Sequence, residues 1–180
     1  MPRWLAIAPV AVLAALALLF GLYGLRHDPH VIPEALVGKM APAMSLSPLD
    51  GGAAINVAAN RTGDRVRLIN FFASWCVPCV SENADLVALK ASGVPITGVA
   101  YKDKPGATRA FLARLGNPFD LVLMDPDGTA GVEYGVSGVP ETFAVDASGR
   151  ILAKHSGQLT PEIADRLLEA MWRESLHLVN

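Results

Sequence analysis

The stretch Phe71-Phe72-Ala73-Ser74-Trp75-Cys76-Val77-Pro78-Cys79 decides the fold, and it contains the only two cysteines of the 180-residue chain. Two residues separate Cys76 from Cys79, and the pair stands where an apolar run gives way to a helical pattern. This arrangement is typical of a dithiol/disulfide redox pair. With Cys76 at the helix N-cap and Cys79 one turn further on, the two sulfurs can bond without movement of the backbone.

The start of the predicted helix gives the two cysteines different roles. Unpaired backbone N–H groups and the helix dipole favour a thiolate at Cys76. Cys79 follows one turn into the helix and is predicted to be less accessible to a partner. We therefore expect Cys76 to attack a partner disulfide and Cys79 to resolve the mixed disulfide.

Three other uses of a cysteine pair fit this sequence less well. A structural zinc site needs four ligands, and the chain has neither a second cysteine pair nor histidines at ligand spacing. Covalent haem attachment requires a histidine directly after the second cysteine, where this chain has Val80. A disulfide that closes a two-residue loop restrains the unfolded chain very little, so it is a poor structural staple. The sequence therefore favours redox chemistry without a metal or cofactor.

The N-terminal part of the chain is predicted to anchor it in a membrane. Residues 4–25 carry no charge and are rich in Leu and Ala, and a helix over them, at about 1.5 Å per residue, spans roughly the 30 Å hydrocarbon core. A cleavable signal peptide is the alternative, but the apolar run is long for one, and residues 21–24 lack an A-x-A-like cleavage site. We expect a membrane anchor over 1–25, a polar linker over 26–36 and a folded domain over 37–180.

The folded domain is predicted to alternate strands and helices. The chain has 52% hydrophobic residues and a net charge of −2, which suits one domain plus a membrane segment and gives no reason to expect a nucleic-acid partner. A strand hairpin is expected over 44–57. Further strands are predicted over 65–72, 95–100, 119–124, 141–145 and 150–155, and helices over 80–91, 105–115, 127–134 and 160–173. This order predicts an α/β fold with a mixed sheet and helices on both faces.

These motifs together resemble the thioredoxin superfamily. The motif WCVPC at 75–79 resembles its active site, and Gly138-Val139-Pro140 resembles its cis-proline loop. A longer ordered set, made of Asn70 and the segments 98–103, 115–119 and 135–143, resembles the thiol:disulfide interchange proteins of cytochrome c maturation, the DsbE/CcmG type. The resemblance covers about residues 36–172.

The resemblance implies both a fold and a function. The fold is a thioredoxin-like mixed sheet flanked by helices, with the N-terminal hairpin as an extension and one transmembrane helix before it. The function is that of a protein disulfide reductase, held by a single-pass anchor in the bacterial inner membrane with its domain in the periplasm. Such proteins take electrons from a membrane-embedded thiol donor. They pass them to the cysteine pair of apocytochrome c or to another thiol protein of the maturation system.

A partner groove is expected beside the cysteines. Val139-Pro140 precedes an apolar strand, where a cis peptide bond would set a backbone edge beside Cys76. The residues predicted to line the groove are Trp75, Val139, Pro140 and Glu141.

Two acids are predicted to tune the thiolate. Glu82, one turn past Cys79, and Glu141, directly after Pro140, both bring negative charge towards the sulfurs. Because a less stabilised thiolate makes a more reducing couple, both acids fit a reductant. Asn70 stands where thioredoxins proper carry a buried acid, so either glutamate is also a candidate proton acceptor for Cys79.

Two other functions stay open. A general extracytoplasmic disulfide oxidase or isomerase would be favoured by a basic or histidine-containing pair between the cysteines, where this chain has Val77 and Pro78. A non-catalytic adaptor of the cytochrome assembly machinery would be favoured by a cysteine pair without redox activity.

Overall fold

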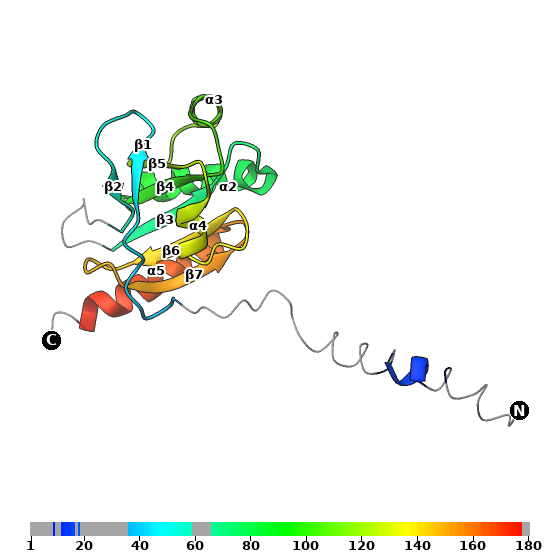
Figure 1. Cartoon of the computed structure of the whole chain (residues 1–180). Coiled ribbons are helices and arrows are strands. Elements are labelled where there is room, and N and C mark those ends of the chain that lie inside the picture. The colour runs from blue at the N-terminus through cyan, green and yellow to red at the C-terminus, as the bar shows by residue number, and fades with distance from the viewer. Residues whose placement is uncertain (1–8, 10–11, 17, 19–35, 59–65, 178–180) are drawn as a thin grey trace, which may run out of the picture. The chain divides into compact units, whose positions relative to one another are not determined.

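The computed structural model describes the chain except residues 1–8, 10–11, 17, 19–35, 59–65 and 178–180 (Figure 1). The chain divides into two units, Met1–Glu34 and Ala35–Asn180. In the first unit the described residues are Pro9, 12–16 and Leu18, and all are helical. Among the described residues, no helix is both long enough and apolar enough to cross a membrane. Most of the predicted anchor and nearly all of the predicted linker lie outside the described residues, so both stay predictions.

The second unit contains every strand and helix that the sequence predicts for the domain. The strands are β1 (Ser45–Pro48), β2 (Ile55–Asn56), β3 (Arg67–Phe72), β4 (Ile96–Tyr101), β5 (Leu121–Asp125), β6 (Glu141–Val145) and β7 (Ile151–Ser156). The helices are α2 (Val77–Ala91), α3 (Pro105–Leu115), α4 (Thr129–Glu133) and α5 (Pro161–His177).

The strands form one mixed sheet in the order β2-β1-β5-β4-β3-β6-β7 (Figure 1). The strands β3, β4 and β5 are parallel, while β6 and β7 follow in antiparallel register on the other side of β3. The predicted hairpin of β1 and β2 joins this sheet, because β1 pairs antiparallel with β5. The last helix, α5, runs along β6 and β7 (Figure 1). The thioredoxin-like mixed sheet flanked by helices is thus confirmed.

The central strand β3 supplies side chains to two apolar layers, one on each face of the sheet. Successive side chains of a strand point to opposite faces. Leu68 and Phe72 pack in the layer that also holds the two cysteines, while Ile69 and Phe71 pack in the opposite layer with Phe143. Burying one large apolar side chain stabilises the fold by about 1.5–3 kcal/mol. Every residue of β3 is buried, in keeping with the four apolar side chains among its six residues.

A close approach in the cysteine layer requires glycine at Gly98 of β4. A Cβ at this position would lie 2.7 Å from the ring of Phe119. The absence of a side chain lets the Phe119 ring reach Phe72, with 4.6 Å between the two ring centroids. This packing fills the layer below the carboxyl end of β3, from which the chain continues to the cysteines.

Candidate active site

The two cysteines lie between the carboxyl end of β3 and the first turn of α2, and a disulfide joins them. Cys76 is the N-cap residue of α2, and the backbone N–H of Cys79 donates to its sulfur over 3.1 Å. Pro78 occupies the first turn, where its missing N–H leaves no helical hydrogen bond unmade. Once the disulfide is reduced, this N–H group and the helix dipole stabilise a thiolate at Cys76.

Two exposed apolar side chains flank the buried Cys76 in the sequence. Cys76 is 4% exposed and Cys79 is 2% exposed, whereas Trp75 and Val77 beside them are 58% and 77% exposed. The sulfur of Cys76 lies 3.4 Å from the carbonyl oxygen of Val139. The structure therefore brings three of the four predicted groove residues, Trp75, Val139 and Pro140, to the cysteine pair. The predicted cis peptide bond between Val139 and Pro140 is present.

Glu82 is a buried carboxylic acid one helical turn after Cys79. It is 0% exposed, and its two oxygens accept hydrogen bonds from the side-chain amide of Asn70 over 3.1 Å and from the backbone N–H of Leu159 over 2.8 Å. Residues three apart on a helix face are neighbours, so this carboxyl lies on the Cys79 side of α2. Among the described residues no lysine or arginine forms an ion pair with it.

The surroundings of Glu82 favour its protonated form. Burial raises the pKa of Glu82 from 4.5 to about 7, against the opposing effect of the hydrogen bonds from Leu159 and Asn70, and the nearby Asp85 adds to the rise. A carboxyl group with a pKa near 7 exchanges its proton at neutral pH. Glu82 can therefore accept and release a proton beside the buried Cys79.

Glu141 is equally buried, at 1% exposed, but its charge is compensated. One oxygen lies 2.8 Å from the ammonium group of Lys154, and the other accepts hydrogen bonds from the backbone N–H and hydroxyl of Ser137 over 3.0 and 2.6 Å. Lys154 also donates to the carbonyl of Gly135 over 2.8 Å. The pair therefore fastens the loop that leads to Val139 and Pro140.

The two glutamates face opposite sides of the sheet. Thr142 accepts a hydrogen bond from Asn70 over 3.0 Å, so Thr142 points to the cysteine layer. Its neighbour Glu141 must then point to the other layer, because adjacent strand residues alternate. The tuning role of both acids stays a prediction, and this geometry ranks Glu82 well ahead of Glu141.

Two residues of the site were given no role from the sequence. Lys154, the ion-pair partner of Glu141, lies on β7 and could not be assigned from spacing alone. Asp103, which accepts hydrogen bonds from Ser74 over 2.7 and 2.8 Å, directly precedes the N-cap of α3. An acid placed between a strand and a helix that opens with proline is a recognisable signal for a residue that binds backbone N–H groups.

Comparison with known proteins agrees with this geometry. Residues 36–170 match the Redoxin family. The chain is 42% identical over 146 residues to the thiol:disulfide interchange protein HelX of Rhodobacter capsulatus, covering 81% of this chain and 82% of the relative. It is 34% identical over 165 residues to the thiol:disulfide interchange protein DsbE of Escherichia coli K12, covering 92% and 89%. The chain belongs to the redoxin family, as a DsbE-type thiol:disulfide interchange protein.

A solved structure supports the same assignment. The crystal structure of a putative thiol:disulfide interchange protein DsbE from Chlorobium tepidum has a TM-score of 0.61 and 29% sequence identity, and covers 75% of this chain and 97% of that chain. The DsbE-type assignment together with the Cys76–Cys79 disulfide makes this protein a thiol:disulfide oxidoreductase, which acts on thiol-containing partner proteins. This confirms the activity predicted from the sequence.

Proposed function

We propose that this DsbE-type protein reduces the cysteine pair of apocytochrome c, or of a thiol protein that serves it, so that haem can be attached. The observation that carries the proposal is the buried Glu82, without a cationic partner among the described residues, beside the disulfide. When it is ionised, an acid at this position disfavours a thiolate at either cysteine. The reduced form is then less stable relative to the disulfide. Above about pH 7, where Glu82 is ionised, the protein therefore gives up electrons to a partner readily.

The proposed reaction is a two-step thiol:disulfide exchange. The Cys76 thiolate attacks one sulfur of the partner disulfide, a new bond forms between them, and the partner's second sulfur leaves as a thiolate that takes up a proton. Cys79 then gives its proton to the Glu82 carboxylate and attacks the sulfur of Cys76. The bond between Cys76 and the partner breaks, and the partner's sulfur leaves as a thiolate that takes up the proton held by Glu82. The partner leaves as a dithiol, and the protein keeps the Cys76–Cys79 disulfide. A membrane-embedded thiol donor returns two electrons to this disulfide, and two protons accompany them.

The groove beside the disulfide holds the partner segment in this proposal. The backbone at Val139 and the exposed Trp75 and Val77 border the sulfur of Cys76, so an extended segment can pair with the loop while its cysteine approaches. Glu141 supports this groove without lining it, because its ion pair with Lys154 holds in place the loop that carries Val139 and Pro140.

We also propose the cellular arrangement that the sequence predicts. Residues 1–25 form a single-pass anchor in the bacterial inner membrane, residues 26–36 form the linker, and the domain over 37–180 lies in the periplasm. The charge-free run at 4–25 supports this arrangement, as does the compactness of the Ala35–Asn180 unit.

The cysteine roles are tested with two single variants. Cys79→Ser should accumulate a mixed disulfide between Cys76 and a disulfide-bonded substrate peptide, because the resolving thiol is gone. Cys76→Ser should accumulate none, because Cys79 is buried inside the first turn of α2. Non-reducing electrophoresis separates the adducts. Trapping through Cys79 and not through Cys76 would reverse the assigned roles.

The substrate is tested by comparing two disulfides at equal driving force. The reduced protein should reduce an oxidised apocytochrome c peptide with a C-x-x-C-H motif rapidly and insulin slowly. Equal rates would contradict a dedicated substrate and indicate a general reductase. Faster formation than reduction of disulfides would indicate the oxidase or isomerase alternative, and no exchange with either substrate would indicate the adaptor.

A further inference from the structure

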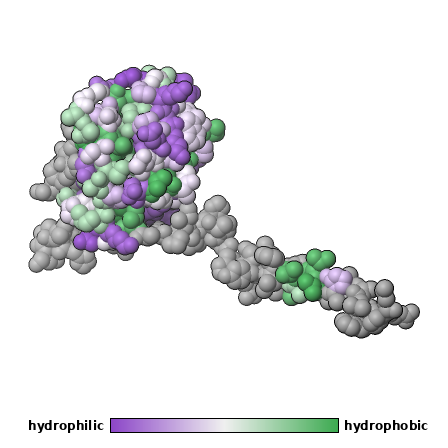
Figure 2. Space-filling model, in the orientation of Figure 1, coloured by the Kyte–Doolittle hydropathy of each residue, from purple (hydrophilic) through white to green (hydrophobic). Residues whose placement is uncertain are grey.

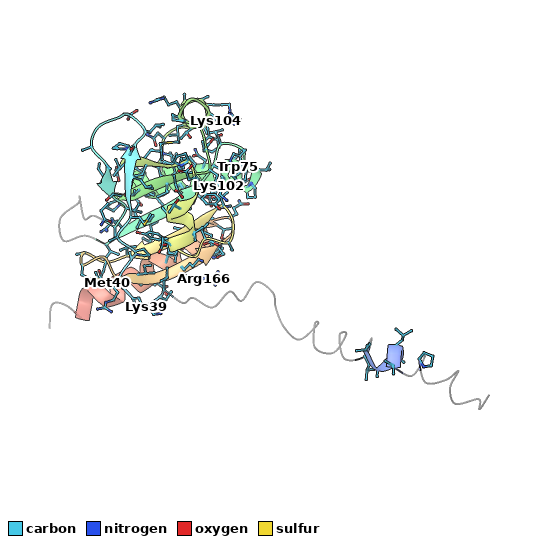
Figure 3. The ribbon with its side chains drawn as sticks, viewed as in Figure 1. Lys39, Met40, Trp75, Lys102, Lys104 and Arg166 are labelled. Atoms are coloured by element: carbon cyan, nitrogen blue, oxygen red, sulfur yellow. A yellow bond between two sulfur atoms is a disulfide. The ribbon has the colours of Figure 1, made fainter. Side chains whose placement is uncertain are left out.

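The loop that joins β4 to α3 is bonded to the two residues before Cys76. The carboxylate of Asp103 accepts the backbone N–H of Ser74 over 2.7 Å and its hydroxyl over 2.8 Å. The indole N–H of Trp75 donates to the carbonyl of Lys102 over 3.2 Å, and Figure 3 shows Trp75 and Lys102 next to each other at the surface. Neither contact forms part of the exchange reaction itself.

Asp103 divides its hydrogen bonds between Ser74 and α3. We call the segment from Ser74 to Cys76 the redox loop. It is 6% exposed, and besides Ser74 it accepts the backbone N–H of Lys104 over 2.8 Å and the hydroxyl of Thr108 over 3.0 Å. Each carboxylate oxygen thus has two donors, one from Ser74 and one from the start of α3. Hydrogen bonds to an ionised acceptor are about twice as strong as neutral ones. Asp103 therefore links Ser74 to the first turn of α3, and this link restrains the position of Ser74.

The backbone at Lys102 is also set in an unusual conformation. Its φ of 47° lies in the left-handed region, which residues other than glycine rarely adopt. The N–H of Lys102 donates to the carbonyl of Asp125 over 2.8 Å, which holds the residue against the end of β5. The carbonyl that binds Trp75 is thus presented by a backbone that the surrounding structure holds firmly.

The contacts to Ser74 and Trp75 bear directly on Cys76. Only Trp75 stands between Ser74 and Cys76, and the N–H of Cys76 donates to the carbonyl of Ala73 over 3.2 Å in a tight turn. If Ser74 moves, this turn moves with it. The sulfur of Cys76 then shifts relative to the N-terminus of α2 and to Val139, and the exposed indole of Trp75 loses its fixed position.

We propose that Asp103 is a positioning residue for thiol:disulfide exchange. Through Ser74 it fixes the turn that presents the sulfur of Cys76 and the indole of Trp75 to an incoming partner. The proposal concerns the exchange reaction of any thiol with this site. It therefore stands or falls separately from the identity of the substrate.

The two halves of the Asp103 network provide a matched pair of variants. Ser74→Ala removes one hydroxyl donor on the side of the redox loop, and Thr108→Val removes one hydroxyl donor on the side of α3. Both variants are made in the full-length chain in detergent micelles. Dithiothreitol serves as the attacking thiol, and its second-order rate with the oxidised protein is measured at constant pH. The thermal midpoint of each variant reports the structural cost.

We expect Ser74→Ala to slow the reduction by about threefold, the effect of losing one hydrogen bond of modest net strength. Thr108→Val should slow it clearly less, because the N–H of Lys104 still holds Asp103 and both bonds from Ser74 remain. Both variants should lower the thermal midpoint by similar amounts. Acrylamide quenching of Trp75, obtained by subtracting the signal of the matching Trp75→Phe protein, should increase in Ser74→Ala alone. Ser74→Thr, which keeps the hydroxyl, should restore both the rate and the quenching.

The proposal is overturned if the two variants change the rate equally, because Asp103 would then act only on stability. It is also overturned if Ser74→Ala alters neither the rate nor the Trp75 quenching. The Asp103→Asn protein provides a second check, since it removes the charge from both halves of the network. Its exchange rate should fall at least as far as that of Ser74→Ala.

Discussion

The two buried glutamates of this protein, Glu82 and Glu141, occupy opposite faces of the same sheet and have opposite surroundings. Glu82 receives two hydrogen bonds but has no cationic partner among the described residues, and burial raises its pKa to about 7. Glu141 is just as buried but is paired with Lys154 at 2.8 Å. The proposal gives the first acid the role of carrying a proton, while the ion pair of the second holds a loop.

The comparison shows that distance along the chain from a catalytic group says little about an acid's role. Glu82 and Glu141 each lie within a few residues of a motif at the active site, and the sequence alone treats them alike. The alternation of side chains along β6 sends Glu141 away from the cysteines, while the turn of α2 keeps Glu82 beside Cys79. The viewed face of the domain, with its mixed hydrophilic and hydrophobic residues, gives no hint of this buried difference (Figure 2).

The largest change in stability is expected when the ion pair between Glu141 and Lys154 is broken. Lys154→Met leaves a buried carboxylate without its cation, and we expect a loss of about 3–5 kcal/mol in the free energy of unfolding. Urea denaturation measures the loss. Lys90→Met, which removes the more exposed pair with Asp120 at 3.9 Å, serves as the control and should cost about 1 kcal/mol or less.

A double variant shows where that cost arises. Adding Glu141→Gln to Lys154→Met removes the unpaired charge, so the double variant should be more stable than Lys154→Met alone. If the double variant is the less stable of the two, the buried charge is not the source of the loss.

The next effect concerns the pH dependence of stability on the Glu82 side. In the oxidised protein the cysteines do not titrate. Glu82 has a pKa of about 7 when folded and an ordinary value of 4.5 when unfolded, so between these values the folded state binds a proton that the unfolded state lacks. Its contribution to stability is therefore fully present below pH 4.5 and is lost as the pH rises through about 7, a change of roughly 3 kcal/mol.

Variants of the two acids isolate this contribution. Urea unfolding of the oxidised protein at a series of pH values should show the decline in the wild type and in Glu141→Gln but not in Glu82→Gln. A decline that persists in Glu82→Gln and disappears in Glu141→Gln would exchange the roles of the two acids.

A smaller effect is expected on the Cys76 thiol of the reduced protein. In the wild type we expect the pKa of Cys76 to lie below the roughly 8.5 of a free thiol and well above the roughly 3.5 of strongly oxidising relatives. Glu82→Gln should lower it by about one unit, because a nearby negative charge is removed. Glu141→Gln should shift it much less, since Lys154 already compensates that carboxylate. The pH dependence of iodoacetamide alkylation measures both shifts, and equal shifts would contradict the ranking.

Much of the fold could be predicted because its signals are local. The apolar run of β3, the proline at the start of α3 and the spacing of Cys76 and Cys79 each depend on a few neighbouring residues. The pairing of β1 with β5 could not be predicted in this way, because it depends on which edge of the sheet is free to receive a strand.

The site was predictable where the chemistry dictates the residue type and unpredictable where it depends on distant contacts. The disulfide and the cis bond before Pro140 follow from motifs. The partner of Glu141 lies on the next strand, and Asp103 lies 29 positions from the Ser74 that it binds. Hydrogen bonds of this kind depend on the register of strands and on loop geometry, and neither has a periodic signature in the sequence.

The most direct test of the account is the equilibrium reduction potential of the Cys76–Cys79 pair against glutathione, measured at about pH 8, where a Glu82 with a pKa of about 7 is ionised. We predict that Glu82→Gln makes the couple less reducing by roughly 20 mV, because the thiolate gains stability when the carboxylate is removed. Glu141→Gln should leave the potential close to that of the wild type. An unchanged potential in Glu82→Gln, or an equal shift in both variants, would contradict the claim that the unpaired buried acid sets the reducing power of this site.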